Sequence, residues 1–132
     1  MTPRRTRNAL LAVTASLTLA FAHAAGASSG APAKDEIDHL LNFVAASSCT
    51  FVRNGTEYPS DKAREHLATK YQFAGSRIST AEEFISYLAT QSSMSGELYH
   101  VKCGKADALS GVWLTNELKH YRETPRLQHV SR

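Results

Sequence analysis

Residues Cys49-Thr50-Phe51-Val52-Arg53-Asn54-Gly55-Thr56-Glu57-Tyr58 predict a β-hairpin, and the other elements of the chain can be placed around it. Apolar side chains alternate with polar ones along the residues that flank Asn54-Gly55. An Asn-Gly pair favours a two-residue turn, because both central positions of a type I′ turn need a positive φ. The segment therefore predicts two antiparallel strands, 49–53 and 56–58.

The first 24 residues predict a signal peptide and not a part of the fold. Three arginines precede an apolar run from Ala9 to Ala22, which ends in the small-x-small pattern Ala22-His23-Ala24. The run is about 14 residues long and is shorter than the ~20 residues that span a membrane. We expect cleavage after residue 24, with Ala25-Gly26-Ala27 as the alternative site. We also expect export to the periplasm or to the medium, and no membrane span once the leader is removed.

The net charge disfavours nucleic acid as a partner. The whole chain carries 15 Lys and Arg against 12 Asp and Glu, but three of the arginines lie in the leader. The remaining chain is therefore close to neutral, whereas nucleic-acid-binding proteins present a basic stripe. The same balance argues against electrostatic attachment to a membrane surface.

The two cysteines, Cys49 and Cys103, predict one disulfide, because an exported chain reaches an oxidising compartment. Cys103 ends a second alternating run, 98–103. If the disulfide joins neighbouring antiparallel strands, Phe51 lies beside Val101 and Arg53 lies beside Tyr99. This register is an expectation that coordinates can test.

Apolar periodicity and capping signals predict four helices in the rest of the chain. The strongest start is Ser79-Thr80-Ala81-Glu82-Glu83, which contains two overlapping capping boxes. Residues 104–109 predict a turn, and no internal repeat is evident. The helices are expected at about 34–47, 61–74, 81–90 and 110–121.

These elements predict an α+β fold, with about four helices packed around a three-stranded antiparallel sheet and one disulfide. The expected strand order is 56–58, 49–53, 98–103. The chain divides into the signal peptide 1–24, a flexible Ser/Gly/Ala/Pro-rich lead-in 25–33, a single domain 34–122 and a frayed tail 123–132.

Five motifs follow one another along the chain: Phe51-Val52-Arg53-Asn54-Gly55, Ala63-x-x-His66-Leu67-x-x-Lys70, Arg77-Ile78-x-Thr80-Ala81-Glu82-x-Phe84-Ile85, Ser92-Ser93-x-Ser95-Gly96 and Tyr99-x-Val101. In their order and spacing, these motifs resemble the YfeK-like family of small exported bacterial proteins. The resemblance spans roughly residues 37–103. It implies an exported bacterial protein with a domain of unknown function, and it brings no established activity, substrate or catalytic residue.

Arg53 and Asn54 at the tip of the hairpin, and Tyr99 on the neighbouring strand, are candidate binding residues. An arginine held beside a rigid turn can receive a carboxylate or phosphate in a bidentate manner. The alternative is that Asn54-Gly55 only forms the turn and that Arg53 packs its aliphatic stem against Tyr99.

His66 and Lys70 are four residues apart and therefore share one face of their helix. They predict a positive ledge beside Arg53, or alternatively a boundary row whose aliphatic parts cover the edge of the core. Ser93 and Ser95 can offer hydroxyl groups to a ligand or make local hydrogen bonds to the backbone.

The sequence lacks the usual motifs of a catalytic or metal site. It has no S-x-x-K, and its one G-x-S-x-G match, Gly26-Ala27-Ser28-Ser29-Gly30, lies in the Ser/Gly/Ala/Pro-rich lead-in and not between a predicted strand and helix. The histidines after the leader contain no H-x-x-x-H pair. Glu82 and Glu83 are explained by helix capping. We therefore predict no catalytic residue, no metal and no cofactor.

The sequence as a whole predicts a small, non-catalytic binding or accessory protein of the cell envelope. Its partner would be an envelope protein or a small anionic ligand, which contacts the hairpin tip, the ledge and the loop 92–96. The alternative is a small envelope hydrolase or transferase that uses His66 with a nearby serine or carboxylate. A purely structural envelope component is a third interpretation.

Overall fold

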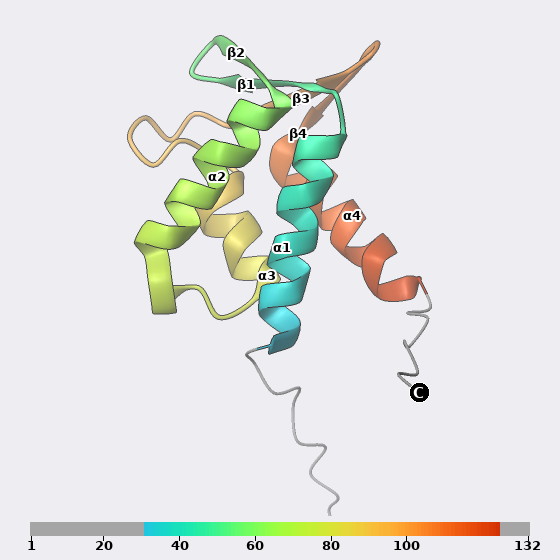
Figure 1. Cartoon of the computed structure of the whole chain (residues 1–132). Helices are drawn as coiled ribbons and strands as arrows, with labels where there is room; N and C mark the ends of the chain where they lie inside the picture. The colour runs from blue at the N-terminus through green and yellow to red at the C-terminus, as the bar shows by residue number, and fades with distance from the viewer. Residues whose placement is uncertain (1–30, 125–132) are drawn as a thin grey trace, which may run out of the picture.

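The computed structural model describes residues 31–124. A sheet lies across one end of the molecule, and the helices run away from it (Figure 1). The predicted signal peptide, most of the lead-in and the tail beyond residue 124 lie outside the described residues. The elements are α1 (Ala31–Ala46), β1 (Thr50–Arg53), β2 (Thr56–Pro59), α2 (Ser60–Ala74), the 3-10 turn η1 (Gly75–Arg77), α3 (Ala81–Glu83), the π-helical η2 (Phe84–Ala89), β3 (His100–Cys103), β4 (Ala106–Leu109) and α4 (Ser110–Glu123).

The sheet is antiparallel and has four strands in the order β2-β1-β3-β4. The predicted α+β class with four helices is confirmed, but the prediction of three strands is wrong. Ala106–Leu109, which was expected in a turn, pairs with β3 as a fourth strand. Its sequence, Ala-Asp-Ala-Leu, contains no β-branched or aromatic residue, so intrinsic propensity gives no strand signal. The hairpin with β3 imposes the strand instead.

The first hairpin and its pairing with β3 follow the sequence closely. Asn54 and Gly55 have φ of 48° and 73°, as a two-residue turn with two positive φ values requires. Phe51 is paired with Val101 across β1 and β3, which confirms the predicted register. The Cys49–Cys103 disulfide is present, with 4.7 Å between the two Cα atoms. That spacing is typical of a non-hydrogen-bonded antiparallel pair.

The chain contains an internal structural repeat. Adding 50 to every residue number of β1 and β2 gives β3 and β4, and the helix after each hairpin begins at Ser60 or Ser110. The shift by 50 relates Thr50 to His100 and Val52 to Lys102, so it converts the pair Thr50↔Lys102 into the pair Val52↔His100. A pseudo-twofold axis therefore passes between β1 and β3 at the central pair, Phe51↔Val101. Consistent with this axis, the two hairpin tips point to opposite sides of the sheet (Figure 1). The sequence predicts no internal repeat, and the structure shows that this prediction is wrong.

The helix predicted at 81–90 is a short α-helical turn, α3, that continues as η2. The hydroxyl of Thr80 accepts the Glu83 N–H at 3.1 Å, and the Glu83 carboxylate accepts the Ser79 N–H at 2.6 Å. These bonds form one of the two predicted capping arrangements. Glu82 instead pairs with Arg122 of α4, which also holds Glu36 of α1 at 2.8 Å. This ion-pair cluster joins three helices.

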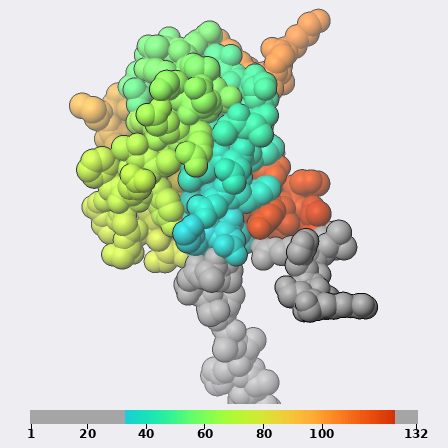
Figure 2. All heavy atoms as spheres, viewed as in Figure 1, coloured from blue at the N-terminus to red at the C-terminus, as the bar shows by residue number. Residues whose placement is uncertain are grey.

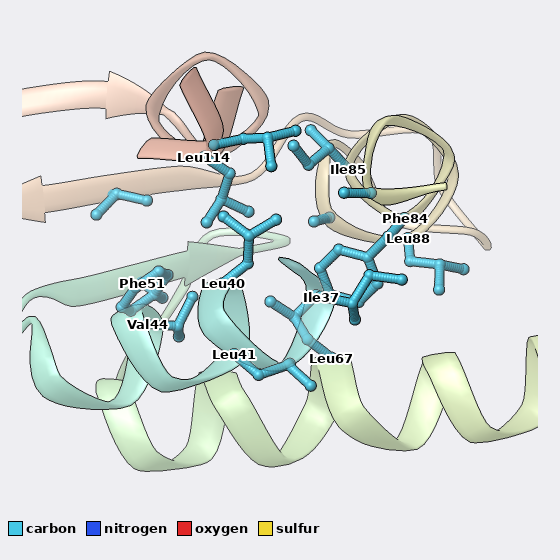
Figure 3. Close-up of a cluster of buried hydrophobic side chains, with 14 of the residues drawn as sticks. Ile37, Leu40, Leu41, Val44, Phe51, Leu67, Phe84, Ile85, Leu88 and Leu114 are labelled. Carbon is cyan, nitrogen blue, oxygen red and sulfur yellow. The ribbon is translucent and has the colours of Figure 1, made fainter. Parts of the chain in front are cut away.

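The core lies beneath the sheet, where the four helices converge (Figure 3). Leu40 and Val44 of α1 and Leu114 of α4 are fully buried, and Phe84 is 1% exposed. Figure 2 shows α1 and α2 side by side over one face, with the segment before β3 projecting beside α2. Among the helices of residues 31–124, none is both long and apolar enough to cross a bilayer.

Candidate functional site

Arg53 and Tyr99 meet at one end of the ladder formed by β1 and β3. The register that pairs Phe51 with Val101 carries Arg53 toward Tyr99 in one direction and Cys49 toward Cys103 in the other. The pseudo-twofold axis therefore relates Arg53 to Cys103 and Tyr99 to Cys49. One end of the ladder is joined by the disulfide, and the equivalent end presents a cation and a phenol.

The Arg53 side chain is fixed by two neighbours. Its Nη1 atom lies 2.9 Å from Nδ1 and 3.0 Å from Nε2 of His66, which projects from α2. Its Nη2 atom donates to the hydroxyl of Tyr58 at 3.3 Å, and the guanidinium lies 5.1 Å from the centre of the Tyr58 ring. Because a guanidinium can only donate, the contact with His66 requires an unprotonated ring nitrogen as acceptor. This geometry favours the neutral form of His66.

Lys70 is bound by backbone carbonyls at the end of η2 and does not extend freely into solvent. Its Nζ atom donates to the carbonyl oxygen of Leu88 at 2.6 Å and to that of Gln91 at 3.4 Å. It also lies 3.4 Å from the Tyr99 hydroxyl and 5.2 Å from the centre of that ring. The carbonyls at the end of a helix have no intrahelical partner, so Lys70 satisfies groups that would otherwise be left unpaired. The predicted ledge is therefore partly a structural contact.

Substituting Lys70 by Met is expected to lower the free energy of unfolding by about 1–3 kcal/mol, because two carbonyl groups lose a charged donor. Methionine keeps the aliphatic stem, so the loss reports on the ammonium group. Urea unfolding measures the difference. Lys119→Met serves as the control, since that lysine side chain is 76% exposed on α4 and should change stability little. Equal effects of the two substitutions would contradict a structural role for Lys70.

The cluster is electropositive and partly removed from water. Burial lowers the pKa of His66, and the nearby charges of Arg53 and Lys70 lower it further. Burial also lowers the pKa of Lys70, again with a contribution from Arg53, and burial raises the pKa of the Tyr99 phenol. Within residues 31–124, no carboxylate forms an ion pair with Arg53, His66 or Lys70. The site therefore holds positive charge without a counter-ion.

A pocket of about 390 Å³ opens beside this cluster, between the first hairpin and α2. Arg53, Tyr58, His66 and Tyr99 supply its polar groups, and an exposed ion pair between Lys62 and Glu65 lies along its wall. The volume lies within the range of about 300–1,000 Å³ that is usual for small-molecule sites. Thr69 and Ser110 also line the pocket, and the apolar side chains of the lining are Phe51, Ala63 and Leu67.

Asn54 and the serines form a second group, which holds a loop against the hairpin. The Ser95 hydroxyl donates to Oδ1 of Asn54 at 2.7 Å, and Nδ2 of Asn54 lies 3.5 Å from Oγ of Ser92. The backbone N–H of Ser95 also donates to Oγ of Ser92 at 3.3 Å. Ser92 is 5% exposed, whereas Ser93 is exposed and makes no side-chain hydrogen bond within the described residues. These contacts support the alternative that the serines organise the loop.

The structure thus brings together Arg53, His66, Lys70 and Tyr99, and it separates them from Ser93. Asn54 and Ser95 contact each other but do not line the pocket. Sequence reasoning missed one contributor. Tyr58 closes one side of the pocket, and its place in the strand opposite Phe51 was the available signal. Nothing in the part of the chain that the structure describes groups His, Cys, Asp and Glu side chains as a metal site would require.

Comparison with known proteins agrees with the resemblance drawn from the motifs. The uncharacterized protein YfeK of Salmonella typhimurium is 41% identical over 64 residues, which are 48% of this chain and 53% of that protein. The chain therefore covers about half the length of this relative. No solved structure matches the chain. The model of the family of unknown function DUF5329 matches residues 31–122, which are most of the sequence. The chain thus belongs to the DUF5329 family, whose function is unknown.

Proposed function

We propose that this protein is a small exported binding protein that holds the carboxylate or phosphate group of a small ligand at Arg53, without catalysis. The observation that carries the proposal is the cluster of Arg53, His66 and Lys70 at a pocket, with no carboxylate paired to any of them within residues 31–124. Partly buried cations without a counter-ion are unfavourable, and a bound anion relieves that cost.

The geometry of Arg53 supports recognition of a planar or tetrahedral anion. A guanidinium has five N–H donors, of which the contacts to His66 and Tyr58 use only a part. Those two contacts hold the group in one orientation before a ligand arrives, so less conformational entropy is lost on binding. Arg53 is therefore the residue that we expect to contact the anion directly.

The neighbours of His66 favour binding over the alternative of a small hydrolase or transferase. A histidine that acts as general base is usually oriented by a carboxylate and lies close to a nucleophile. The side chains that contact His66 are Arg53 and Tyr99, and Lys70 lies nearby. Arg53 and Lys70 oppose protonation of the imidazole, because their positive charges lower its pKa. None of the three neighbours is a carboxylate or a serine.

The leader supports export, and the disulfide is consistent with an oxidising compartment such as the periplasm. Fractionation of the producing cells tests this part of the proposal. A protein that starts after residue 24 and is recovered with the envelope fraction would support it. An uncleaved protein in the cytoplasm would contradict it.

Substituting Arg53 by Gln is expected to weaken binding of inorganic phosphate about ten- to a hundredfold, because a charged hydrogen-bond donor is lost. A titration followed by amide chemical shifts measures the dissociation constant and locates the site. Arg64→Gln is the matched control, since Arg64 is exposed on α2, does not line the pocket and carries the same charge. Equal weakening in both variants, or no shift change near Arg53 in the native protein, would contradict the proposal.

Binding of a small anion is expected to strengthen as the pH falls into the range where His66 takes up a proton, which in the free protein lies below the ordinary pKa of histidine, about 6.5. In the free protein, burial and the charges of Arg53 and Lys70 lower the pKa of His66. A bound anion raises that pKa, so the complex takes up a proton in a pH range where the free protein does not. Sulfate is a suitable probe, because its charge is constant between about pH 5 and 8. His66→Gln should flatten the pH profile, and a native profile without slope would contradict the role of His66.

A further inference from the structure

We propose that the ligand carries its acidic group on a small apolar body, such as a short alkyl chain or an aromatic ring. This inference rests on the proposed function, because it concerns the part of the pocket that lies beyond the cations. A site for a bare inorganic anion needs only polar donors. Here a polar side with Arg53 and His66 continues into a lining of apolar side chains.

The apolar lining comes from two rigid elements. Phe51 belongs to β1, and Ala63 and Leu67 belong to α2. Phe51 and Leu67 also belong to the buried core, so their positions are fixed by packing that does not depend on a ligand. A preformed apolar surface beside oriented donors is the usual composition of a small-molecule site.

The pseudo-twofold axis explains why there is room for an apolar body in this half of the molecule. The position that corresponds to Ala63 of α2 is Trp113 of α4. The Trp113 ring packs 4.5 Å from the ring of Phe43 and 5.7 Å from that of Phe51, measured between centroids. The small side chain of Ala63 therefore leaves space where the related position carries an indole. Similarly, Tyr58 and Arg53 correspond to Ala108 and Cys103, so the second half has no counterpart of these two polar groups.

The size of the pocket restricts the ligand to a small molecule. Its volume of about 390 Å³ is near the lower end of the usual range for such sites. Burial of a short apolar body adds affinity in proportion to the area removed from water. Relative to the anion alone, a ring or a six-carbon chain is therefore expected to increase affinity at least about tenfold.

The experiment compares ligands that share a head group or a body. The protein, as recovered from producing cells with its disulfide intact, is titrated with inorganic phosphate, phenyl phosphate, hexyl phosphate, phenol and hexanol. Both phosphate esters are expected to bind at least about tenfold more tightly than inorganic phosphate and than the matching alcohol. A preference for one ester distinguishes an aromatic from an alkyl body. Esters that bind no better than inorganic phosphate would overturn this inference and leave the proposed function standing. Alcohols that bind as tightly as the esters, or no binding by any compound, would overturn the proposed function itself.

Two substitutions test the apolar lining without altering charge. Ala63→Leu fills part of the pocket and is expected to weaken binding of the esters about tenfold more than binding of inorganic phosphate. Ala46→Leu is the matched control, since Ala46 is exposed at the end of α1 and outside the pocket. Ala63→Ser provides a second variant of nearly unchanged volume, should Ala63→Leu fail to fold, and it should weaken the esters selectively. Ester affinities that neither substitution changes would overturn the inference.

Discussion

Reduction of the Cys49–Cys103 disulfide is expected to lower the free energy of unfolding by about 4 kcal/mol, the value that the chain-entropy model gives for a loop of this length. The two cysteines are 54 residues apart in sequence. The crosslink excludes many extended conformations of the unfolded chain, whereas the folded sheet already holds the two strands side by side. Because small domains are stable by only about 5–15 kcal/mol, the loss would be a large part of the total.

Urea unfolding of the same protein with and without a thiol reductant measures this effect. A Cys49→Ala/Cys103→Ala variant is the control, because its unfolding should not respond to the reductant. If the free energies of unfolding with and without the reductant differ by less than about 1 kcal/mol, the strand pairing alone restrains the chain. The expected result also predicts that the protein folds poorly in a reducing compartment, which links stability to the proposed export.

Phe84→Ala is expected to destabilise the fold by about 3–5 kcal/mol, the usual cost of removing a buried aromatic side chain. Phe84 begins η2, is 1% exposed and has the largest fully buried side chain among the described residues. Its ring lies 5.7 Å from that of Tyr71 in an edge-to-face arrangement, which links η2 to α2. The substitution would leave a cavity where these two elements meet the core.

Thermal and urea unfolding of Phe84→Ala can be compared with those of Phe73→Ala. Phe73 lies on α2 and is 81% exposed, so its removal should change the unfolding free energy by less than about 0.5 kcal/mol. A small effect of both substitutions would mean that η2 rearranges to fill the cavity. Because η2 also supplies the carbonyl that Lys70 binds, the Phe84 variant tests whether this helix supports the site.

The features that the sequence predicts well are those with strong local signals. The Asn54-Gly55 turn depends only on two backbone conformations, and the disulfide then follows from the presence of two cysteines. Together they set the strand register and bring Arg53 close to Tyr99. His66 shares a helix face with Lys70, so its place near Arg53 also follows from local periodicity.

The features that the sequence does not predict depend on tertiary contacts. β4 becomes a strand only because β3 pairs with it. The role of Lys70 depends on the carbonyl groups at the end of η2 that have no other partner. The i,i+4 spacing of His66 and Lys70 describes one face of α2 and gives no information about η2. The pocket depends on the absence of a large side chain at position 63, which becomes meaningful only beside Trp113.

The repeat is hidden in the sequence for a related reason. Between residues 50–74 and 100–124, identical residues at a spacing of 50 are confined to Ser60 with Ser110 and Tyr71 with Tyr121. Backbone geometry tolerates such divergence as long as each half keeps an apolar face toward the core. The two halves have therefore kept a common architecture while their side chains have taken different tasks.

The position of the disulfide has a consequence for how the chain could be divided. Cys49 lies before the segment that connects the two halves, and Cys103 lies after it. Arg77 is exposed in that segment, at the end of η1, where trypsin can reach it. A single nick there would produce two polypeptides that remain one molecule through the S–S bond. Reduction and reoxidation would then allow one half to be exchanged for an isotope-labelled or altered copy, so that each half can be studied separately within one assembled protein.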